Sequence, residues 1–193
     1  MRADAIAAPR GMTFRAQIGL FTGLALATML ALMALAFSVM QRSEALADLV
    51  LIDVKLANAS GSVDMMHDAL RGDALAAQLA GPQAPEAQRQ ALREETGKHV
   101  KTMLEAFDSV DAAASKPEVR ALVGPLKPAV QGYGTAAARL VDSALAGPVD
   151  ATALQGFQQA FSDLETRLDA LRDSVEASAA ADVQAAAAWH LGA

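Results

Sequence analysis

The residues best suited to chemistry are four polar side chains that follow one another at helical spacing: Asp64, His67, Asp68 and Arg71. Spacings of three and four residues place such side chains on one flank of a helix. The planar fork of Arg71 can hold the carboxylate of an amino or organic acid through two hydrogen bonds. We therefore name Arg71, His67 and Asp68 as candidate ligand-binding residues. The simpler alternative is an exposed ion pair between Asp68 and Arg71, worth roughly a few tenths of a kcal/mol.

The rest of the sequence contains no pattern typical of catalysis. It has no glycine-rich phosphate loop, no nucleophile elbow and no pair of histidines at metal-binding spacing. The three histidines, His67, His99 and His190, are isolated from one another. Cysteine is absent, which excludes disulfides, thiolate nucleophiles and covalent haem attachment. We expect no catalytic residues, no metal site and no cofactor, and hence no enzyme.

The composition predicts an all-α protein. Alanine and leucine are abundant, aromatic residues make up 4% of the chain, and alternating β-branched runs are missing. The formal net charge of −6 is spread along the chain without a basic patch. Because few aromatic rings are available to stack on bases, nucleic acid is not an expected partner.

An uncharged run, residues 16–41, lies between Arg15 and Arg42. As a helix rising about 1.5 Å per residue, residues 17–40 reach roughly 36 Å, enough to cross a hydrocarbon core of about 30 Å. We predict a transmembrane helix at 17–40, with the lipid bilayer as a partner. The pattern Ala34-Leu35-Ala36 also fits a cleaved secretory signal, but the run exceeds the usual signal core of about 7 to 15 residues, which favours an uncleaved anchor.

Charges on the two sides of this run differ. Arginines precede it at positions 2, 10 and 15, whereas Glu44, Asp48 and Asp53 follow it closely. Positive charge favours the cytoplasmic side of a membrane. The predicted location is thus a bacterial inner membrane crossed once, with residues 1–16 in the cytoplasm and the remainder in the periplasm.

Four helices are expected beyond the span, at about 41–80, 86–114, 117–146 and 151–188, the first continuing directly from the membrane helix. Each carries an apolar stripe, and in the first and last helix the spacing alternates between three and four, the 3.5-residue period of a coiled-coil seam. The first seam consists of Ala45, Leu49, Ile52, Leu56, Ala59, Val63, Met66 and Leu70. Short turns between long helices predict an antiparallel up-down-up-down four-helix bundle over residues 41–188.

Several residues predict local features of these helices. Ser115 is the expected N-cap of the third helix, with Glu118 completing a capping box. Asp150 is the expected N-cap of the fourth helix. Pro125 and Pro128 predict a kink in the third helix. Tyr133 is expected to extend its hydroxyl to the edge of the bundle.

The segment Val63–Asp73 resembles the first periplasmic helix of bacterial methyl-accepting chemotaxis proteins that carry a four-helix-bundle sensor domain. The segment Leu154–Glu165 resembles the fourth helix of the same family, and an N-terminal anchor that continues into the first helix is similar as well. The resemblance covers nearly the whole chain, and the order of the parts is more specific than any one segment.

This resemblance implies a homodimeric receptor that senses a small attractant or repellent, directly or through a periplasmic binding protein. A small shift of the last helix would carry the signal inward. Ligand sites of the family use arginines of the first helix at the dimer interface. No position here matches one of them residue by residue, so Arg71 remains a candidate on chemical grounds alone.

The family places a second membrane span, a HAMP linker and a cytoplasmic signalling hairpin after the sensor domain. Residues 189–193 stand where the second span would begin, and Trp189 suits a membrane interface. We therefore expect a receptor chain truncated before these regions. Two alternatives remain open: the sensor half of a membrane histidine kinase with a similar bundle, and a membrane-anchored helical scaffold that binds another protein.

Overall fold

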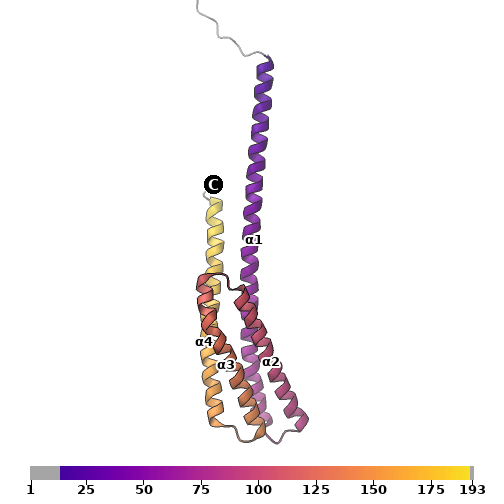
Figure 1. Cartoon of the computed structure of the whole chain (residues 1–193), viewed down its shortest axis with the longest axis vertical. Helices are drawn as coiled ribbons and strands as arrows, with labels where there is room; N and C mark the ends of the chain where they lie inside the picture. The colour runs from indigo at the N-terminus through magenta and orange to yellow at the C-terminus, as the bar shows by residue number, and fades with distance from the viewer. Residues whose placement is uncertain (1–13, 192–193) are drawn as a thin grey trace, which may run out of the picture. The chain divides into compact units, whose positions relative to one another are not determined.

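The computed structural model describes the backbone of residues 14–191 and the side chains of residues 14–185, other than 16, 45, 46 and 49. The described residues form no strand and four α-helices, joined by short turns (Figure 1). These helices are α1 Phe14–Ala80, α2 Glu86–Ala113, α3 Pro117–Ala146 and α4 Ala151–Leu191. The all-α class is confirmed. The interface position predicted for Trp189 concerns a side chain outside the described residues.

The chain divides into two compact units, Met1–Ala47 and Asp48–Ala193. In the first unit, α1 presents large apolar side chains such as Phe21 and Leu30 to its surroundings. The stretch Gln17–Glu44 has a mean hydropathy of 2.2 and is the one helical stretch of the described residues long and apolar enough to cross a membrane. A signal sequence near an N-terminus passes the same test of length and hydropathy.

The second unit is built on one hydrophobic core to which all four helices contribute. Of the first predicted seam, the positions Leu56, Val63 and Leu70 are buried there, and Ala59 and Met66 pack against it, which confirms them as core positions. Burial of each large apolar side chain contributes about 1.5–3 kcal/mol. The largest fully buried side chains are Val63 and Leu70 of α1; Met103, Phe107 and Val110 of α2; Val119, Leu126, Tyr133, Leu140 and Leu145 of α3; and Leu164 and Leu171 of α4.

The helix ends follow from glycine, proline and aspartate. Gly81 ends α1 in the left-handed region at φ 63°, where a side chain would be strained. Asp150 caps α4 as predicted, because its Oδ1 accepts the backbone N–H of Thr152 at 2.9 Å. α3 is one continuous element through both of its internal prolines.

The capping box predicted at Ser115 is wrong. The N-cap of α3 is Lys116, which has extended backbone angles and makes no side-chain capping bond. Pro117 explains the shift, because its fixed φ suits the first helical position and its missing N–H needs no partner there. The N-cap therefore falls on Lys116 rather than on Ser115.

α2 and α3 approach closely at Gly134 of α3. A Cβ atom built there would lie 3.1 Å from Cγ1 of Val100 and 3.5 Å from Cε of Met103. The first of these distances is tighter than ordinary van der Waals contact, so the absent side chain lets the two helices pack.

We predict that Gly134→Leu lowers the free energy of unfolding by about 1–3 kcal/mol, because the added side chain overpacks the contact between α2 and α3. The control is Gly97→Leu on α2, where a Cβ meets nothing within 4 Å. That change should be neutral, or stabilising by up to about 1 kcal/mol through helix propensity. Denaturant unfolding of the full chain in detergent, followed by circular dichroism, measures both. Equal stability of the two variants would contradict the close approach.

Candidate functional site

The four polar residues singled out by their spacing do not share one environment. His67 is 2% exposed and lies in the core, whereas Asp64, Asp68 and Arg71 are exposed. Among the described residues, no ion pair joins Asp68 to Arg71. The spacing predicted one shared flank for these residues, and it did not reveal that His67 points inward.

His67 is held by an aromatic cluster from α3 and α4. Its ring stacks on Phe161 with 4.1 Å between ring centroids and lies 4.8 Å from the ring of Tyr133. Its Nε2 lies 3.2 Å from the Phe161 carbonyl oxygen. Because a carbonyl can only accept, Nε2 carries the proton in this contact. The guanidinium carbon of Arg71 lies 4.9 Å from the centroid of the same phenylalanine ring, a cation–π contact.

Tyr133 is fully buried, so the expectation that its hydroxyl reaches the bundle edge is wrong. The hydroxyl donates to the backbone carbonyl oxygen of His67 at 2.7 Å, and this internal partner replaces solvent. Burial raises the pKa of Tyr133 far above its usual value. The phenol therefore remains a neutral hydrogen-bond donor, and its part here is structural.

A second polar contact joins α1 to α2. Oδ2 of Asp73 lies 2.7 Å from Nδ1 of His99, and the Asp73 side chain is mostly buried. Sequence reasoning did not select this pair. The available signal was that Asp73 follows Leu70 at the next seam position, where an apolar residue is expected. A carboxylate at a seam position requires a partner, and His99 supplies it.

Lys116 joins three segments of the second unit. Its Nζ donates to Oδ2 of Asp182 at 2.7 Å, to Oγ of Ser178 at 2.5 Å and to Oδ1 of Asp53 at 3.3 Å. These partners belong to α1 and α4, whereas Lys116 itself is the N-cap of α3. Burial lowers the pKa of Lys116, but the hydrogen bonds to and the negative charges of Asp182 and Asp53 outweigh it and raise the pKa above 10.5.

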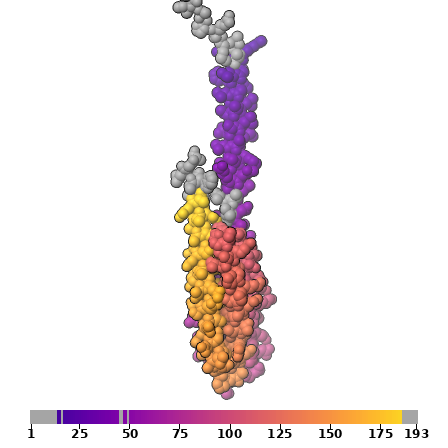
Figure 2. Space-filling view, turned by 60° about the vertical axis from the view of Figure 1, so that its left-hand side comes forward, coloured from indigo at the N-terminus to yellow at the C-terminus, as the bar shows by residue number. Residues whose placement is uncertain are grey.

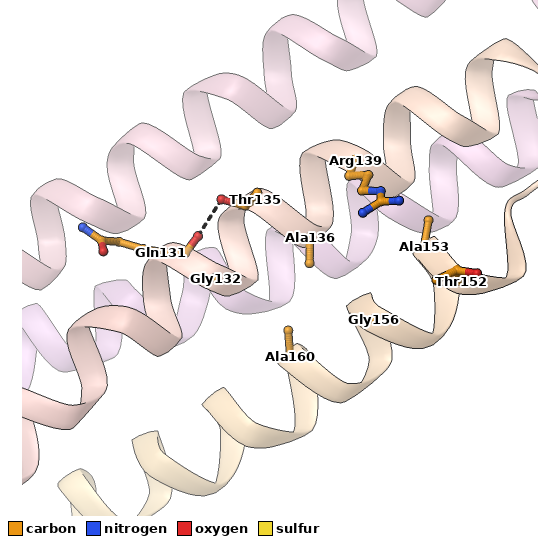
Figure 3. Close-up of a pocket in the computed structure, with 9 residues that line it drawn as sticks. All are labelled: Gln131, Gly132, Thr135, Ala136, Arg139, Thr152, Ala153, Gly156 and Ala160. Atoms are coloured by element: carbon orange, nitrogen blue, oxygen red, sulfur yellow. Dashed lines mark hydrogen bonds between the residues drawn. The ribbon is translucent and has the colours of Figure 1, made fainter.

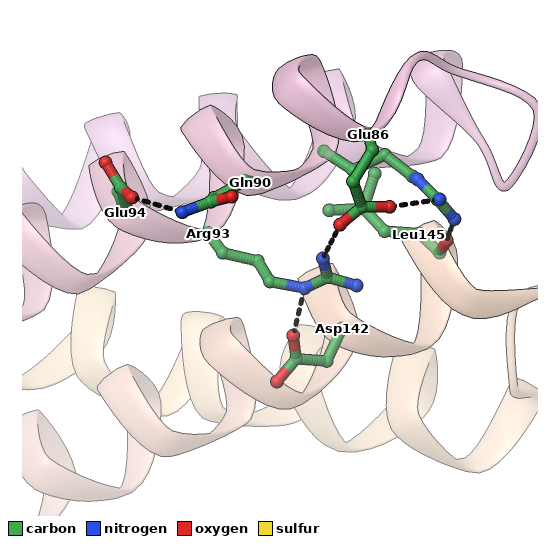
Figure 4. Close-up of polar contacts among 7 residues, drawn as sticks. Glu86, Gln90, Arg93, Glu94, Asp142 and Leu145 are labelled. Atoms are coloured by element: carbon green, nitrogen blue, oxygen red, sulfur yellow. Dashed lines mark hydrogen bonds and ion pairs between the residues drawn. The ribbon is translucent and has the colours of Figure 1, made fainter.

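A further network fixes the start of α2 to the end of α3. Arg93 lies between two carboxylates, with Nε 2.9 Å from Asp142 and Nη1 3.9 Å from Glu86 (Figure 4). Arg89 also pairs with Glu86, and its Nη1 donates to the Leu145 carbonyl oxygen at 3.3 Å. A cation at the last turn of α3 is favoured by the helix dipole. These contacts are partly exposed, and they join α2 to α3.

α3 and α4 lie side by side (Figure 1 and Figure 2), and a groove of about 450 Å³ runs between them. Its walls are mainly small residues, and its one charged residue is Arg139 (Figure 3). A smaller hollow of about 250 Å³ between α1 and α4 is lined in part by Asp64, Arg172 and Glu176. The candidate ligand residues at 67, 68 and 71 line neither space.

The described residues contain no group of three or more histidine, cysteine, aspartate or glutamate side chains that could hold a metal ion. No protein-family model matches the chain, and neither a curated protein nor a solved structure does.

We predict that the Lys116 contacts stabilise the second unit in a pH-dependent manner. Since the folded-state pKa is raised, their contribution is complete below pH 10.5 and is lost as the pH rises through the folded value. Lys116→Met should lower the free energy of unfolding by about 1–3 kcal/mol at neutral pH, because Asp53 and Asp182 lose their partner. The difference from the unsubstituted chain should shrink above pH 10.5.

Denaturant unfolding of Lys116→Met and of the unsubstituted chain across this pH range tests the prediction. Tyr133 is present in both, so its titration cancels when the two free energies of unfolding are subtracted. Lys101→Met is the matched control, because the Lys101 side chain is 76% exposed and pairs only with Glu105 at the surface. Its cost should stay below about 0.5 kcal/mol. Equal costs for the two substitutions would show that the Lys116 contacts are no stronger than a surface pair.

Proposed function

We propose that this chain is the sensory portion of a membrane-anchored receptor built like the bacterial methyl-accepting chemotaxis proteins that it resembles, a binding and signalling module rather than an enzyme. The observation that carries this proposal is α1. One helix, Phe14–Ala80, supplies both the candidate membrane span and a part of the core of the second unit. Such continuity gives a ligand-binding domain a direct covalent connection to the bilayer.

The second unit is proposed to be an antiparallel up-down-up-down four-helix bundle. The contacts between α2 and α3 support this order, because Arg93 meets Asp142 while Val100, further along α2, meets Gly134, which is earlier in α3. At successive contacts, the residue number thus rises along α2 as it falls along α3. The same trend relates α3 to α4. Tyr133 of α3 contacts Phe157 and Phe161 of α4, and Pro125, which is earlier in α3, contacts Arg167, which is later in α4.

The proposed location is the bacterial inner membrane, with the N-terminus in the cytoplasm and the second unit in the periplasm. The apolar stretch Gln17–Glu44 supports anchoring by its length and hydropathy. Arg15 before this stretch, and Asp48 and Asp53 after it, support the orientation through the preference of positive charge for the cytoplasmic side.

We propose homodimerisation through a second stripe on α1. Nine positions in the second unit follow each other at alternating spacings of three and four, and all of them are exposed. They are Leu51, Val54, Asn58, Gly61, Met65, Asp68, Gly72, Leu75 and Leu79. This outer stripe keeps the coiled-coil period but has no apolar partner among the described residues. A second copy of the chain would present the same stripe, and two such stripes are complementary.

The ligand of the proposed receptor is an amino or organic acid, bound directly or presented by a periplasmic binding protein. Arg71 is the proposed carboxylate-binding residue, and the exposed carboxylate of Asp68 would accept an amino group. His67 lies inside, so its proposed part is to position Phe161, on which the guanidinium of Arg71 rests. Because Asp68 also belongs to the outer stripe, a ligand here would adjoin the dimer interface.

We predict that the full chain in detergent sediments as a dimer, and that Met65→Lys weakens the dimer by at least about tenfold, because the interface would bury an unpaired ammonium from each copy. Gln158→Lys, an equivalent charge at an exposed position of α4, should leave the dimer unchanged. Analytical ultracentrifugation over a range of protein concentrations measures both. Insensitivity to Met65→Lys would remove the outer stripe as the interface.

We also predict that at least one compound in a panel of common L-amino acids, acetate, succinate and citrate raises the thermal midpoint of the full chain. A ligand that binds only the folded state stabilises it by about 2.7 kcal/mol at a hundredfold excess over the dissociation constant. Arg71→Ala should abolish the effect while retaining helicity, whereas Lys101→Ala should not. A chain indifferent to the whole panel would favour the scaffold alternative; a response retained in Arg71→Ala would remove Arg71 from the site.

A further inference from the structure

The groove between α3 and α4 has a floor almost free of side chains. Gly132 and Ala136 of α3 face Gly156 and Ala160 of α4, each pair one helical turn apart (Figure 3). A Cβ atom at either glycine would meet nothing within 4 Å. Close packing therefore does not demand glycine here, in contrast to the contact between α2 and α3. The space left is about 450 Å³.

Arg139 is the single charged residue of this groove, and it is exposed. Among the described residues it forms no ion pair. The carboxylates nearest to it along the chain and across the turn are engaged elsewhere. Asp142 pairs with Arg93, and Asp150 accepts the N–H of Thr152. The guanidinium is therefore available to an anion that enters the groove.

The far end of the groove is polar but uncharged. Gln131 lies at the opposite end from Arg139 in Figure 3, and its amide can donate to or accept from a ligand. The two lie eight positions apart in α3, which corresponds to about 12 Å along the helix axis. The groove thus offers a carboxylate partner at one end, a hydrogen-bonding amide at the other and an apolar floor between them.

We infer that this groove binds an elongated organic acid, with a carboxylate on Arg139, the hydrocarbon chain on the glycine and alanine floor, and a polar far end on Gln131. The inference rests on the proposed function and deepens it, because it assigns the receptor a ligand site separate from Arg71. A single guanidinium suits a carboxylate better than a polyanion, and the length of the groove favours a long linear acid over a short one.

The test is calorimetric titration of the full chain in lipid nanodiscs with pimelate, a linear dicarboxylate, and with the shorter succinate. Pimelate should bind the unsubstituted chain more tightly than succinate. Arg139→Gln should weaken pimelate by about tenfold or more through loss of the charge-assisted contact. Gly156→Leu should weaken it similarly, because the leucine fills the groove without displacing a neighbour.

Two matched variants distinguish binding in the groove from binding elsewhere on the chain. Arg71→Gln removes a different exposed guanidinium, and Gly97→Leu adds the same side chain on α2, where space is also open; both should bind pimelate normally. Loss of pimelate binding in Arg71→Gln with retention in Arg139→Gln would overturn the groove and leave the receptor standing. Binding of other acids but not of pimelate would likewise overturn the groove as a ligand site and leave the receptor proposal standing. Failure of every acid to bind the unsubstituted chain would overturn both proposals.

Discussion

The second unit depends on one constraint: each of its helices carries a narrow apolar stripe that is buried only when the other helices are present. Leu70 of α1, Phe107 of α2 and Leu164 of α4 are almost completely buried, and none could be shielded within its own helix. The polar contacts follow from this burial. Asp73 lies at a seam position and is paired with His99, and His67 borders the seam and bonds a carbonyl of α4. Each of these buried polar groups has a partner because an unpaired one would oppose the burial.

A seam of similar residues at a constant period does not by itself determine how far one helix slides along another. A shift by seven residues, about 10 Å along the axis, would again bring apolar positions together. The polar contacts at the two ends remove this ambiguity. Lys116 meets carboxylates of α1 and α4, while Arg93 meets Asp142, and a seven-residue shift would separate each pair. Such contacts contribute specificity of register even where their net stabilisation is small.

Periodicity predicted the parts of the fold that repeat, and it did not reach the parts that depend on single side-chain contacts. The seam through Val63 and Leu70 and the cap at Asp150 were readable, because spacing and local chemistry determine them. The inward orientation of His67 was not, since a residue bordering a seam can face either way. The partners of Lys116 lie more than sixty residues away, and the groove arises from an arrangement of two helices that no local pattern encodes.

The two stripes of α1 differ in composition in a way that bears on the proposed dimer. The first seam is apolar until Asp73, whereas the outer stripe interrupts its large apolar side chains with Asn58, Gly61, Asp68 and Gly72. Small and charged positions lower the area that a second copy could bury, so a dimer formed there would be weaker than one built on leucine throughout. A weak interface is what a small ligand can influence, because a ligand shifts an equilibrium only by its differential affinity for the two states. The composition that would limit the proposed dimer is therefore also what would make it responsive to a ligand.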